Sequence, residues 1–327
     1  MEYLDRKTIL ITGGTGSFGN ALIDYLKDTS VEFIVYSRDE KKQHDMYISK
    51  GNTNISYVVG DIRDKGKLIQ SMKNVDYVFH AAALKHVPTG ENFPEEVIYT
   101  NVLGTKNVIE AAEYCGVKKA VALSTDKAVQ PINAYGMSKA LAEKIISAHK
   151  GETVVVCLRY GNVLGSRGSV VPLFLDRIHQ NKPITITNPK MTRFLVTLNE
   201  AVKLALKCLN SGNNGDLFVI KSPACDIKTL VEALELHYNK EFMKKIIGVR
   251  PGEKIHETLL TSDEVHRSII EYDDGITFAR IPPLDKNLGD FYFSGEDYKE
   301  PEPFTSATTE QYNAMQVLKK IKDSGLI

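Results

Sequence analysis

The stretch Thr8-Ile9-Leu10-Ile11-Thr12, followed at once by Gly13-Gly14-Thr15-Gly16-Ser17-Phe18-Gly19, decides the fold of this chain. The first five residues are apolar and β-prone and predict a strand, while residues 21–26 show helical periodicity. A G-x-G-x-x-G pattern between a strand and a helix indicates a dinucleotide site, because its glycines let backbone N–H groups approach a pyrophosphate at the helix N-terminus. The alternative is an ordinary strand-to-helix turn. The candidate cofactor ligands are Gly13, Thr15, Gly16, Ser17, Phe18 and Gly19.

The residues at the end of the second predicted strand indicate which dinucleotide binds, NAD or NADP. Residues 33–36 are apolar, and the run Ser37-Arg38-Asp39-Glu40-Lys41-Lys42 follows them. A carboxylate at this place usually binds the ribose 2′-hydroxyl of NAD, whereas Arg suits the 2′-phosphate of NADP. Ser37, Arg38 and Lys41 therefore favour NADP, and Asp39 keeps NAD as the less favoured alternative.

Strands continue to alternate with helices through the first half of the chain. Apolar runs at 55–59, 75–80, 120–124 and 154–159 predict strands, and residues 95–115 predict a long helix. Such alternation predicts an α/β fold with a Rossmann-type, doubly wound parallel sheet. The residues after two of these strands are further cofactor candidates: Asp61 and Ile62 beside an adenine, and Ala81, Ala82 and Ala83 beside the ribose and pyrophosphate. Tight helix–strand packing would explain the alanines almost as well.

The pattern loosens after residue 165 and predicts a smaller C-terminal substrate lobe. We expect an NADP-binding Rossmann domain over residues 1–165, a substrate lobe interleaved with it over 166–284, and a surface tail with a terminal helix over 285–327. Guanidinium groups match phosphate oxygens bidentately, so three arginines of the C-terminal half are candidates for holding a diphosphate. They are Arg167, Arg193 and Arg250, although each taken alone is more often a member of a surface ion pair.

Two neighbouring segments carry candidate acid–base chemistry. Ser124-Thr125-Asp126-Lys127 follows a predicted strand, and Tyr135 and Lys139 form a Tyr-x-x-x-Lys motif. Residues four apart share a helix face, and a Lys ammonium beside a phenol favours the phenolate, which can take a proton from a sugar hydroxyl. Asp126 and Lys127 add an acid and a base that plain hydride transfer does not need. The alternatives are a chance Tyr-x-x-x-Lys spacing and an ion pair that only caps a loop.

Composition narrows the class of protein. The 327 residues are 43% hydrophobic, and Lys+Arg 41 balances Asp+Glu 41, so no basic field argues for a nucleic-acid partner. The N-terminus lacks an apolar signal core and no apolar run approaches about 18 residues, so we expect a cytoplasmic protein without a membrane span. The widely spaced Cys115, Cys157, Cys208 and Cys225 predict buried thiols in a reducing compartment, with no metal site.

The glycine run with Ser37–Glu40 resembles an extended short-chain dehydrogenase/reductase. More narrowly, between about Lys7 and Leu260 the chain is similar to the UDP-N-acetylglucosamine 4,6-dehydratases of bacterial polysaccharide biosynthesis. This resemblance implies a UDP-sugar substrate and a homo-oligomer. The segments that carry the narrower resemblance are His80–Pro88, Ser124–Ala128, Arg159–Val163, Gly165–Val170 and Met191–Phe194.

The resemblance also implies a mechanism in which hydride leaves C4 of the sugar and later returns to C6. Tyr135, aided by Lys139, would deprotonate the C4 hydroxyl, and Thr125 would hydrogen-bond the C4 oxygen. Lys127 would then remove the C5 proton, and Asp126 would protonate the departing C6 hydroxyl. The product would be a UDP-4-keto-6-deoxy sugar.

The base role requires a neutral Lys127. We therefore expect its pKa to be lowered by burial or by a neighbouring cation, for which Lys85 and Lys139 are candidates. We expect substrate contacts from Lys85, His86, Asn162, Arg167, Val170, Thr185, Arg193, Arg250 and Glu253.

Three rival functions fit parts of the pattern. A nucleotide-sugar 4-epimerase uses the same hydride cycle, but epimerisation at C4 needs no acid at C6, which the Asp126–Lys127 pair would supply. A multi-step enzyme would add epimerisation at C5 or C3 to the dehydration. A non-catalytic dinucleotide-sensing protein is the most distant interpretation, because such proteins commonly lose the Tyr or Lys that this chain keeps.

Overall fold

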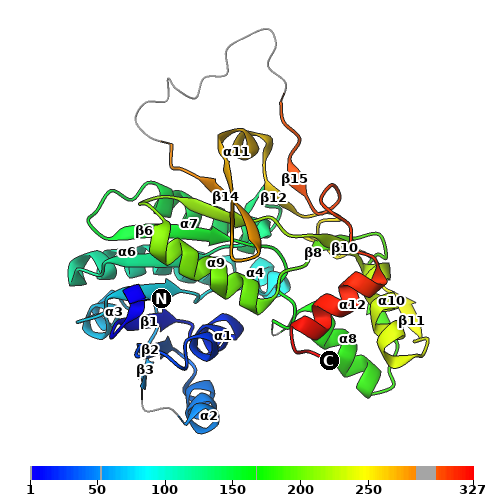
Figure 1. Cartoon of the computed structure of the whole chain (residues 1–327), viewed down its shortest axis with the longest axis horizontal. Coiled ribbons are helices and arrows are strands. Elements are labelled where there is room, and N and C mark those ends of the chain that lie inside the picture. Colours follow the sequence, from blue (N-terminus) through cyan, green and yellow to red (C-terminus); the bar gives the residue numbers. More distant parts are fainter. Residues whose placement is uncertain (1, 52–53, 167, 285–299) are drawn as a thin grey trace.

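A nine-stranded sheet runs through the molecule (Figure 1). The computed structural model describes residues 2–51, 54–166, 168–284 and 300–327. The strands of this sheet are β1 (Thr8–Thr12), β2 (Glu32–Ser37), β3 (Ile55–Val59), β4 (Tyr77–His80), β5 (Lys119–Leu123), β6 (Val154–Arg159), β9 (Leu217–Ile220), β13 (Ile269–Asp273) and β14 (Ile276–Ile281). Their order is β13-β14-β9-β6-β5-β4-β1-β2-β3. All pairs between β9 and β3 are parallel, whereas β14 and β13 add an antiparallel edge.

Helices cover both faces of the sheet. In the first 211 residues they are α1 (Ser17–Tyr25), α2 (Glu40–Lys50), α3 (Lys65–Ser71), α4 (Val87–Asn92), α5 (Pro94–Val97), a π-helix (Ile98–Leu103), α6 (Gly104–Cys115), α7 (Ala134–Ser147), α8 (Val170–His179) and α9 (Leu198–Ser211). Successive strand residues point to opposite faces, so Ile9 and Ile11 join α1 and α9 in one core while Leu10 joins α3 and α6 in the other. The predicted α/β, Rossmann-type doubly wound sheet is therefore confirmed.

A smaller C-terminal lobe stands beside the sheet, on the right in Figure 1. Its core joins α8 to α10 (Ile227–Tyr238) and α12 (Ala314–Asp323), with Phe174, Leu234 and Ile321 all buried. Three two-stranded sheets and a short helix complete the second half of the described chain. They are β7 (Ile184–Ile186) with β11 (Lys244–Ile246), β8 (Thr192–Phe194) with β10 (Ala224–Asp226), β12 (Thr258–Leu260) with β15 (Phe304–Thr305), and α11 (Ser262–Arg267).

Part of the tail that we expected to run over the surface is built into the fold. Ser306, directly after β15, is 0% exposed. Its hydroxyl accepts a hydrogen bond from the Glu257 backbone N–H at 2.8 Å, and its own N–H donates to the Glu257 carbonyl at 2.8 Å. Because these backbone groups are buried, they need partners inside the protein, and the tail supplies them. Residues 285–299 of this tail lie outside the described residues.

A buried arginine joins segments that are far apart in the sequence. The Arg159 side chain at the end of β6 is 3% exposed, and its guanidinium lies 2.6 Å from the Glu143 carboxylate of α7 and 2.8 Å from the Glu264 carboxylate of α11. It also donates to the Leu259 carbonyl of β12 at 2.8 Å. The Ser124 hydroxyl, which ends the run from β5, donates to Glu143 at 2.5 Å. This network attaches the segment around β12 to the helix that carries Tyr135.

A buried histidine joins two strands to a helix. His80 at the end of β4 is 2% exposed, with Nδ1 at 2.7 Å from the Thr12 hydroxyl and Nε2 at 3.0 Å from the Thr105 hydroxyl. Burial lowers the pKa of His80 to about 3, and the nearby Lys139 charge acts in the same direction. The imidazole is therefore neutral at ordinary pH.

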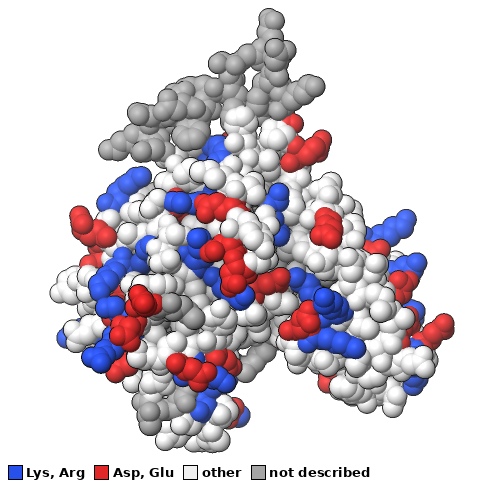
Figure 2. All heavy atoms as spheres, in the orientation of Figure 1, with Lys and Arg blue, Asp and Glu red and all other residues white. Residues whose placement is uncertain are grey.

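Positively and negatively charged side chains are intermixed on the visible surface. Figure 2 shows Lys and Arg interspersed with Asp and Glu over this face. Among the residues that the structure describes, no helix is long and apolar enough to cross a bilayer.

We predict that Arg159→Met lowers the free energy of unfolding by about 3–5 kcal/mol, because it leaves two carboxylates buried without their cation. Denaturant unfolding of both proteins measures the difference. The matched control is Lys228→Met, which removes an exposed pair with Glu232 at 3.5 Å and should cost less than about 0.5 kcal/mol. Equal small losses in both variants would show that the Arg159 network does not stabilise the fold.

We also predict that His80 makes stability fall as the pH drops. Its folded pKa of about 3 lies below the ordinary value of 6.5, so the unfolded chain binds a proton that the folded chain excludes. This contribution is complete above about pH 6.5 and is lost towards pH 3 at up to about 1.4 kcal/mol per pH unit. His80→Gln should flatten that slope in urea titrations, while the exposed His44→Gln should leave it unchanged. An unchanged slope in His80→Gln would refute the assignment.

Candidate active site

The carboxyl ends of the parallel strands bring the predicted site residues to one edge of the sheet. The glycine turn follows β1, Ser37 ends β2, the alanine run follows β4 and Thr125 follows β5. Open α/β sheets bind their ligands at this edge.

The glycine turn forms a close cradle. Gly13 has a φ of 65°, and a Cβ atom built on it would lie 2.8 Å from the Cα atom of Ala82, so only glycine fits between the two loops. Gly16 is the N-cap of α1, and no side chain caps this helix within the described residues. The first turn of α1 contains no acidic residue, so the positive end of the helix dipole can face an anion. This arrangement fits the pyrophosphate of a dinucleotide.

The charged side chains that follow β2 each have a different partner. The Asp39 carboxylate caps α2 by accepting from the Lys42 N–H at 3.0 Å, and it also pairs with the Lys42 ammonium at 2.6 Å. The Arg38 guanidinium lies 3.3 Å from the Asp61 carboxylate and is 47% exposed. Lys41 pairs with Asp45 at 2.8 Å on the exposed face of α2. The carboxylate that would bind a ribose hydroxyl is therefore already engaged by a helix terminus.

Asp61 and Ile62, the predicted adenine neighbours, lie directly after β3. Burial alone would raise the pKa of Asp61, but hydrogen bonds from Arg63 and the charge of Arg38 outweigh it and hold that pKa below its usual range. Ile62 is 4% exposed and packs so closely on Gly104 that a Cβ there would lie 2.7 Å from its Cδ1 atom.

The helix of the Tyr-x-x-x-Lys motif approaches the Thr125–Lys127 segment closely. Residues Asp126–Ala128 form a 3-10 turn after β5, and a Cβ atom on Gly136 would lie 2.2 Å from the Lys127 carbonyl oxygen. Only glycine at this position lets α7 pack so near. The Thr125 side chain lies near the Tyr135 phenol and acts to lower the pKa of Tyr135.

The ammonium of Lys139 bonds to the backbone at the end of β5. It donates to the Leu123 carbonyl at 2.5 Å, and burial lowers the pKa of Lys139. Burial raises the pKa of Tyr135, and the influences that oppose this rise are the charge of Lys127 and the nearby Thr125 side chain. The Lys139 nitrogen is directed to a backbone carbonyl in this structure, and its expected aid to the Tyr135 phenolate stays a prediction.

Lys127 is held between two buried carboxylates. Its Nζ lies 3.0 Å from Asp126 Oδ1 and 3.4 Å from Glu257 Oε1. Burial by itself would lower the pKa of Lys127, but the charges of Asp126 and Glu257 outweigh it and hold that pKa above its usual range. We expected the pKa of Lys127 to be lowered. This expectation is wrong, because the Glu257 carboxylate lies beside the ammonium and stabilises its charge.

A cavity of about 180 Å³ opens beside Lys127. Four predicted substrate residues line it, Asn162, Arg193, Arg250 and Glu253, together with Val87, Pro88, Asn133, Pro251, Gly252, Lys254 and Glu257. Val170 lines a much smaller neighbouring cavity with Asn162 and Arg193. The structure therefore gathers residues from both halves of the chain around one space.

Arg193 is strongly engaged within the protein. Its guanidinium donates to the carbonyls of Thr192 at 2.7 Å, Lys254 at 3.0 Å and Ile255 at 3.1 Å. Its Nε also lies 3.9 Å from Glu257 Oε1. In this structure Arg193 positions the segment that leads to Glu257, and its predicted diphosphate role stays a prediction.

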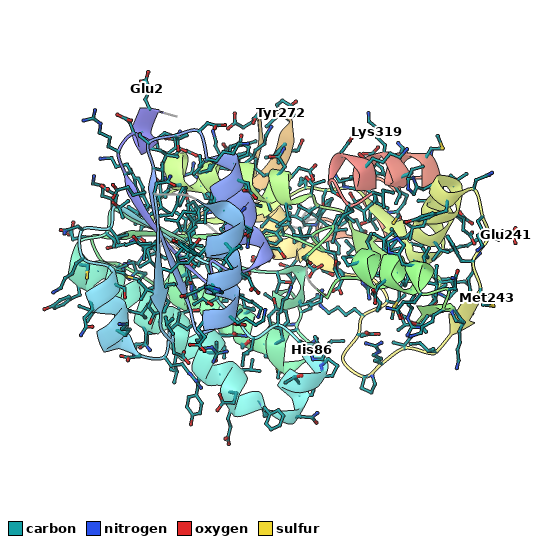
Figure 3. All side chains as sticks on the ribbon, turned by 90° about the horizontal axis from the view of Figure 1, so that it is seen from below. Glu2, His86, Glu241, Met243, Tyr272 and Lys319 are labelled. Atoms are coloured by element: carbon teal, nitrogen blue, oxygen red, sulfur yellow. The ribbon has the colours of Figure 1, made fainter. Side chains whose placement is uncertain are left out.

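Other predicted substrate residues lie away from this cavity. His86 caps α4 at its N-terminus, with Nδ1 2.7 Å from the Thr89 hydroxyl, and Thr185 pairs with Lys245 across β7 and β11. Burial lowers the pKa of Lys85, the neighbour of His86. Arg167 lies outside the described residues. Figure 3 shows His86 at the start of α4, whereas Glu241 and Met243 lie at the outer end of the C-terminal lobe.

Three residues of the site were not predicted. Glu257 follows a basic loop and bears no local motif. Asn133 caps α7 by accepting from the Gly136 N–H at 2.8 Å and donates to the Gly252 carbonyl at 2.9 Å, so a cap signal before Tyr135 would have found it. Asn101 in the π-helix bonds both backbone groups of Leu84 and the Ser138 hydroxyl, which fixes the loop after the alanines.

Within the described parts of the chain, no group of three or more His, Cys, Asp or Glu side chains is arranged to hold a metal ion. Cys157, Cys208 and Cys225 are buried and Cys115 is partly buried, and all four are free thiols.

Comparison with known proteins extends the resemblance. The UDP-glucose 4-epimerase of Rickettsia bellii (strain OSU 85-389) is 47% identical over 325 residues, 95% of this chain and 94% of the relative. The X-ray structure of Pen from Bacillus thuringiensis is 33% identical, with a TM-score of 0.87 over 98% of both chains. DesIV, a dTDP-glucose 4,6-dehydratase from Streptomyces venezuelae solved with NAD and TYD, shares the fold at 22% identity and a TM-score of 0.69, over 76% of this chain and 86% of that one. Since the model of the polysaccharide biosynthesis protein family matches residues 9–277, the chain belongs to that family.

Proposed function

We propose that this protein is a UDP-N-acetylglucosamine 4,6-dehydratase that makes a UDP-4-keto-6-deoxy-N-acetylhexosamine. The observation that carries the proposal is the buried Asp126–Lys127–Glu257 cluster beside the Tyr135 phenol. Moving hydride at C4 requires one base, which Tyr135 supplies. A lysine flanked by two carboxylates adds both an acceptor and a donor of protons, and loss of water across C5 and C6 needs one of each.

A nicotinamide dinucleotide held by the glycine cradle would supply the hydride acceptor and donor. Tyr135 would take the proton of the C4 hydroxyl at its phenol oxygen. Thr125, which lies near that phenol, would orient the C4 oxygen. The positive charge of Lys127 opposes the effect of burial on Tyr135 and so favours the phenolate.

The 4-ketone acidifies the C5 proton, and Lys127 is placed at the cavity wall to remove it. Lys127 carries a proton in the resting structure, since both carboxylates stabilise its charge. To act as a base it must first transfer that proton to a neighbouring carboxylate. A carboxyl group protonated in this way can then assist the departure of the C6 hydroxyl.

A 4-epimerase is the second candidate, because the Rickettsia relatives at 45–47% identity carry the name UDP-glucose 4-epimerase. In an epimerase Lys127 would remain protonated throughout and act only through its charge on Tyr135. The Asp126–Lys127–Glu257 cluster supports dehydration, because epimerisation at C4 leaves the C5 and C6 bonds intact.

We propose NADP as the cofactor, with NAD as the alternative. The Asp39 carboxylate is used by the N-terminus of α2, and Arg38 presents a half-exposed guanidinium at the same strand end. A 2′-phosphate would offer Arg38 a stronger anion than its present partner Asp61.

We further propose that the protein forms a homo-oligomer. Exposed apolar side chains gather on two helices that contact each other, the π-helix and α7, and would lose contact with water in an assembly. They are Ile98, Tyr99, Leu103, Met137 and Leu141.

Incubation with UDP-N-acetylglucosamine in deuterated water, followed by mass spectrometry and proton NMR, tests the function. We expect a product that has lost water and carries deuterium at C5. Lys127→Ala should reduce C5 deuteration by at least about 100-fold, because the base is absent, while the absorbance of reduced nicotinamide still appears. The exposed Lys319→Ala on α12 is the matched control and should behave as wild type (Figure 3).

Unchanged mass with a shifted C4 proton signal would favour the epimerase. Normal C5 deuteration in Lys127→Ala would remove Lys127 from the base role even if water is lost.

We predict that Arg38→Ala weakens NADP binding by roughly 10–100-fold, the loss expected for one charge-assisted hydrogen bond to phosphate. NAD binding should change by less than about threefold, because NAD lacks the 2′-phosphate. Isothermal titration of both dinucleotides measures the ratio. Equal weakening of the two would exclude Arg38 from a phosphate site.

A further inference from the structure

The loop that joins β11 to β12 forms one wall of the cavity in the candidate active site. We call residues 247–254 of this loop the strap. The strap is held to the C-terminal lobe at its start, where the Ile247 N–H donates to the Ile186 carbonyl of β7 at 2.8 Å. Directly after the strap, the Ile255 carbonyl accepts from the Thr192 N–H of β8 at 3.0 Å. The strap residues that line the cavity are Arg250, Pro251, Gly252, Glu253 and Lys254.

The middle of the strap contacts the segment that precedes α7. The Asn133 amide nitrogen donates to the Gly252 carbonyl at 2.9 Å. The Lys254 ammonium donates to the Val129 carbonyl at 2.6 Å. Gly252 also packs on this segment, since a Cβ atom built on it would lie 3.4 Å from the Cβ atom of Asn133. The strap therefore bridges the C-terminal lobe and the Rossmann part of the chain beside the cavity.

Asn133 uses both halves of its amide. Its Oδ1 accepts from the Gly136 N–H at 2.8 Å and caps α7, while its Nδ2 makes the bond to Gly252. The cap alone does not require asparagine, because Ser and Asp cap a helix about as well. The bond to the strap does require it, because an aspartate has no donor and a serine carries a single polar atom. The side chain is 4% exposed, so both of its polar groups need partners inside the protein.

The strap also carries a positive charge at the cavity wall. The Arg250 side chain is 55% exposed, and its guanidinium lies 3.9 Å from the Glu253 carboxylate. An exposed pair at this distance is weak, so an anion in the cavity can compete for the guanidinium. Arg250 is also one of the residues that the sequence predicts to hold a diphosphate.

We propose that Asn133 is a positioning residue that docks the strap on the helix of Tyr135, a role that rests on the proposed binding of a nucleotide sugar in the cavity. Tyr135 lies two residues after Asn133, and Arg250 lies two residues before Gly252. One amide thus relates the side chain that would hold the diphosphate to the phenol that would react with the sugar.

Loss of this bond is expected to change ligand binding more than stability. Both ends of the strap keep their backbone bonds to the C-terminal lobe when Asn133 no longer donates. Gly252 is only partly buried, so its carbonyl can bond to water instead. The strap then remains folded, but its position over the cavity is no longer fixed.

The test is isothermal titration of UDP into the NADP-saturated Asn133→Ser protein and the wild type. We expect the Kd for UDP to rise by roughly 3–10-fold, the effect of about one hydrogen bond. The Kd for NADP and the Tm should stay at their wild-type values, because serine keeps the cap of α7. The matched control is Asn313→Ser at the N-cap of α12, where Asn313 accepts from the Gln316 N–H at 3.0 Å. This control should bind UDP as the wild type does.

A double-variant cycle shows whether Asn133 acts through the strap. Arg250→Ala should by itself weaken UDP, because it removes the guanidinium that meets the diphosphate. In the Arg250→Ala protein, Asn133→Ser should weaken UDP no further, since the strap then has no guanidinium to position. Effects that multiply in the double variant would mean that Asn133 acts by another route, and they would overturn the proposal.

The remaining outcomes are equally decisive. Asn133→Asp also keeps the cap and lacks the donor, so it should weaken UDP at least as much as Asn133→Ser. Weakening by the Asp variant alone would reflect repulsion between its carboxylate and the diphosphate, which contradicts the docking role. Equal losses of UDP and NADP binding would reduce Asn133 to a helix cap. Absence of UDP binding by the wild type overturns the proposal, whereas normal UDP binding without release of water from the sugar removes only the dehydration.

Discussion

The buried charge of Arg159 is the constraint on which both the fold and the candidate site depend. One guanidinium meets carboxylates from α7 and α11 and a carbonyl from β12, so it joins segments that are more than a hundred residues apart along the chain. A buried ion stabilises a structure only when its partners are all in place, so the three segments are held as one unit. Tyr135 lies on one of these segments and Glu257 directly precedes another. The Arg159 network therefore fixes the positions of Tyr135 and Glu257, whatever interactions their own side chains make.

Local patterns were enough to predict the strands and the edge of the sheet that carries the site. The expected strands at 8–12, 55–59 and 154–159 have the observed bounds of β1, β3 and β6, because each is a short apolar run ended by polar or glycine residues. The helix expected over 95–115 is interrupted by a π-helix at Ile98–Leu103. Its cause is tertiary, since Asn101 turns its side chain to Leu84 and Ser138, and helical periodicity contains no sign of those contacts.

The electrostatics of the site could not be predicted in the same way. The sign of the Lys127 shift depends on Glu257, which lies 130 residues later and reaches Lys127 only through the packing of the C-terminal lobe. The Tyr135–Lys139 spacing correctly places both residues on one helix, yet the Lys139 ammonium bonds to the end of β5. Spacing along a helix determines which residues share a face, whereas the partner of a buried charge is decided by whatever else packs against that face.

The two hydrogen bonds between Glu257 and Ser306 have a consequence for the order in which the protein is completed during synthesis. Strands β1 to β6 and the glycine cradle are finished once residue 159 has been added. The backbone of Glu257 gains its buried partners only when residue 306 has left the ribosome. A nascent chain can therefore possess its dinucleotide cradle while the carboxylate opposite Lys127 is still unsecured. The glycine cradle is thus available early, and the contact between Glu257 and Lys127 forms among the last contacts of the molecule.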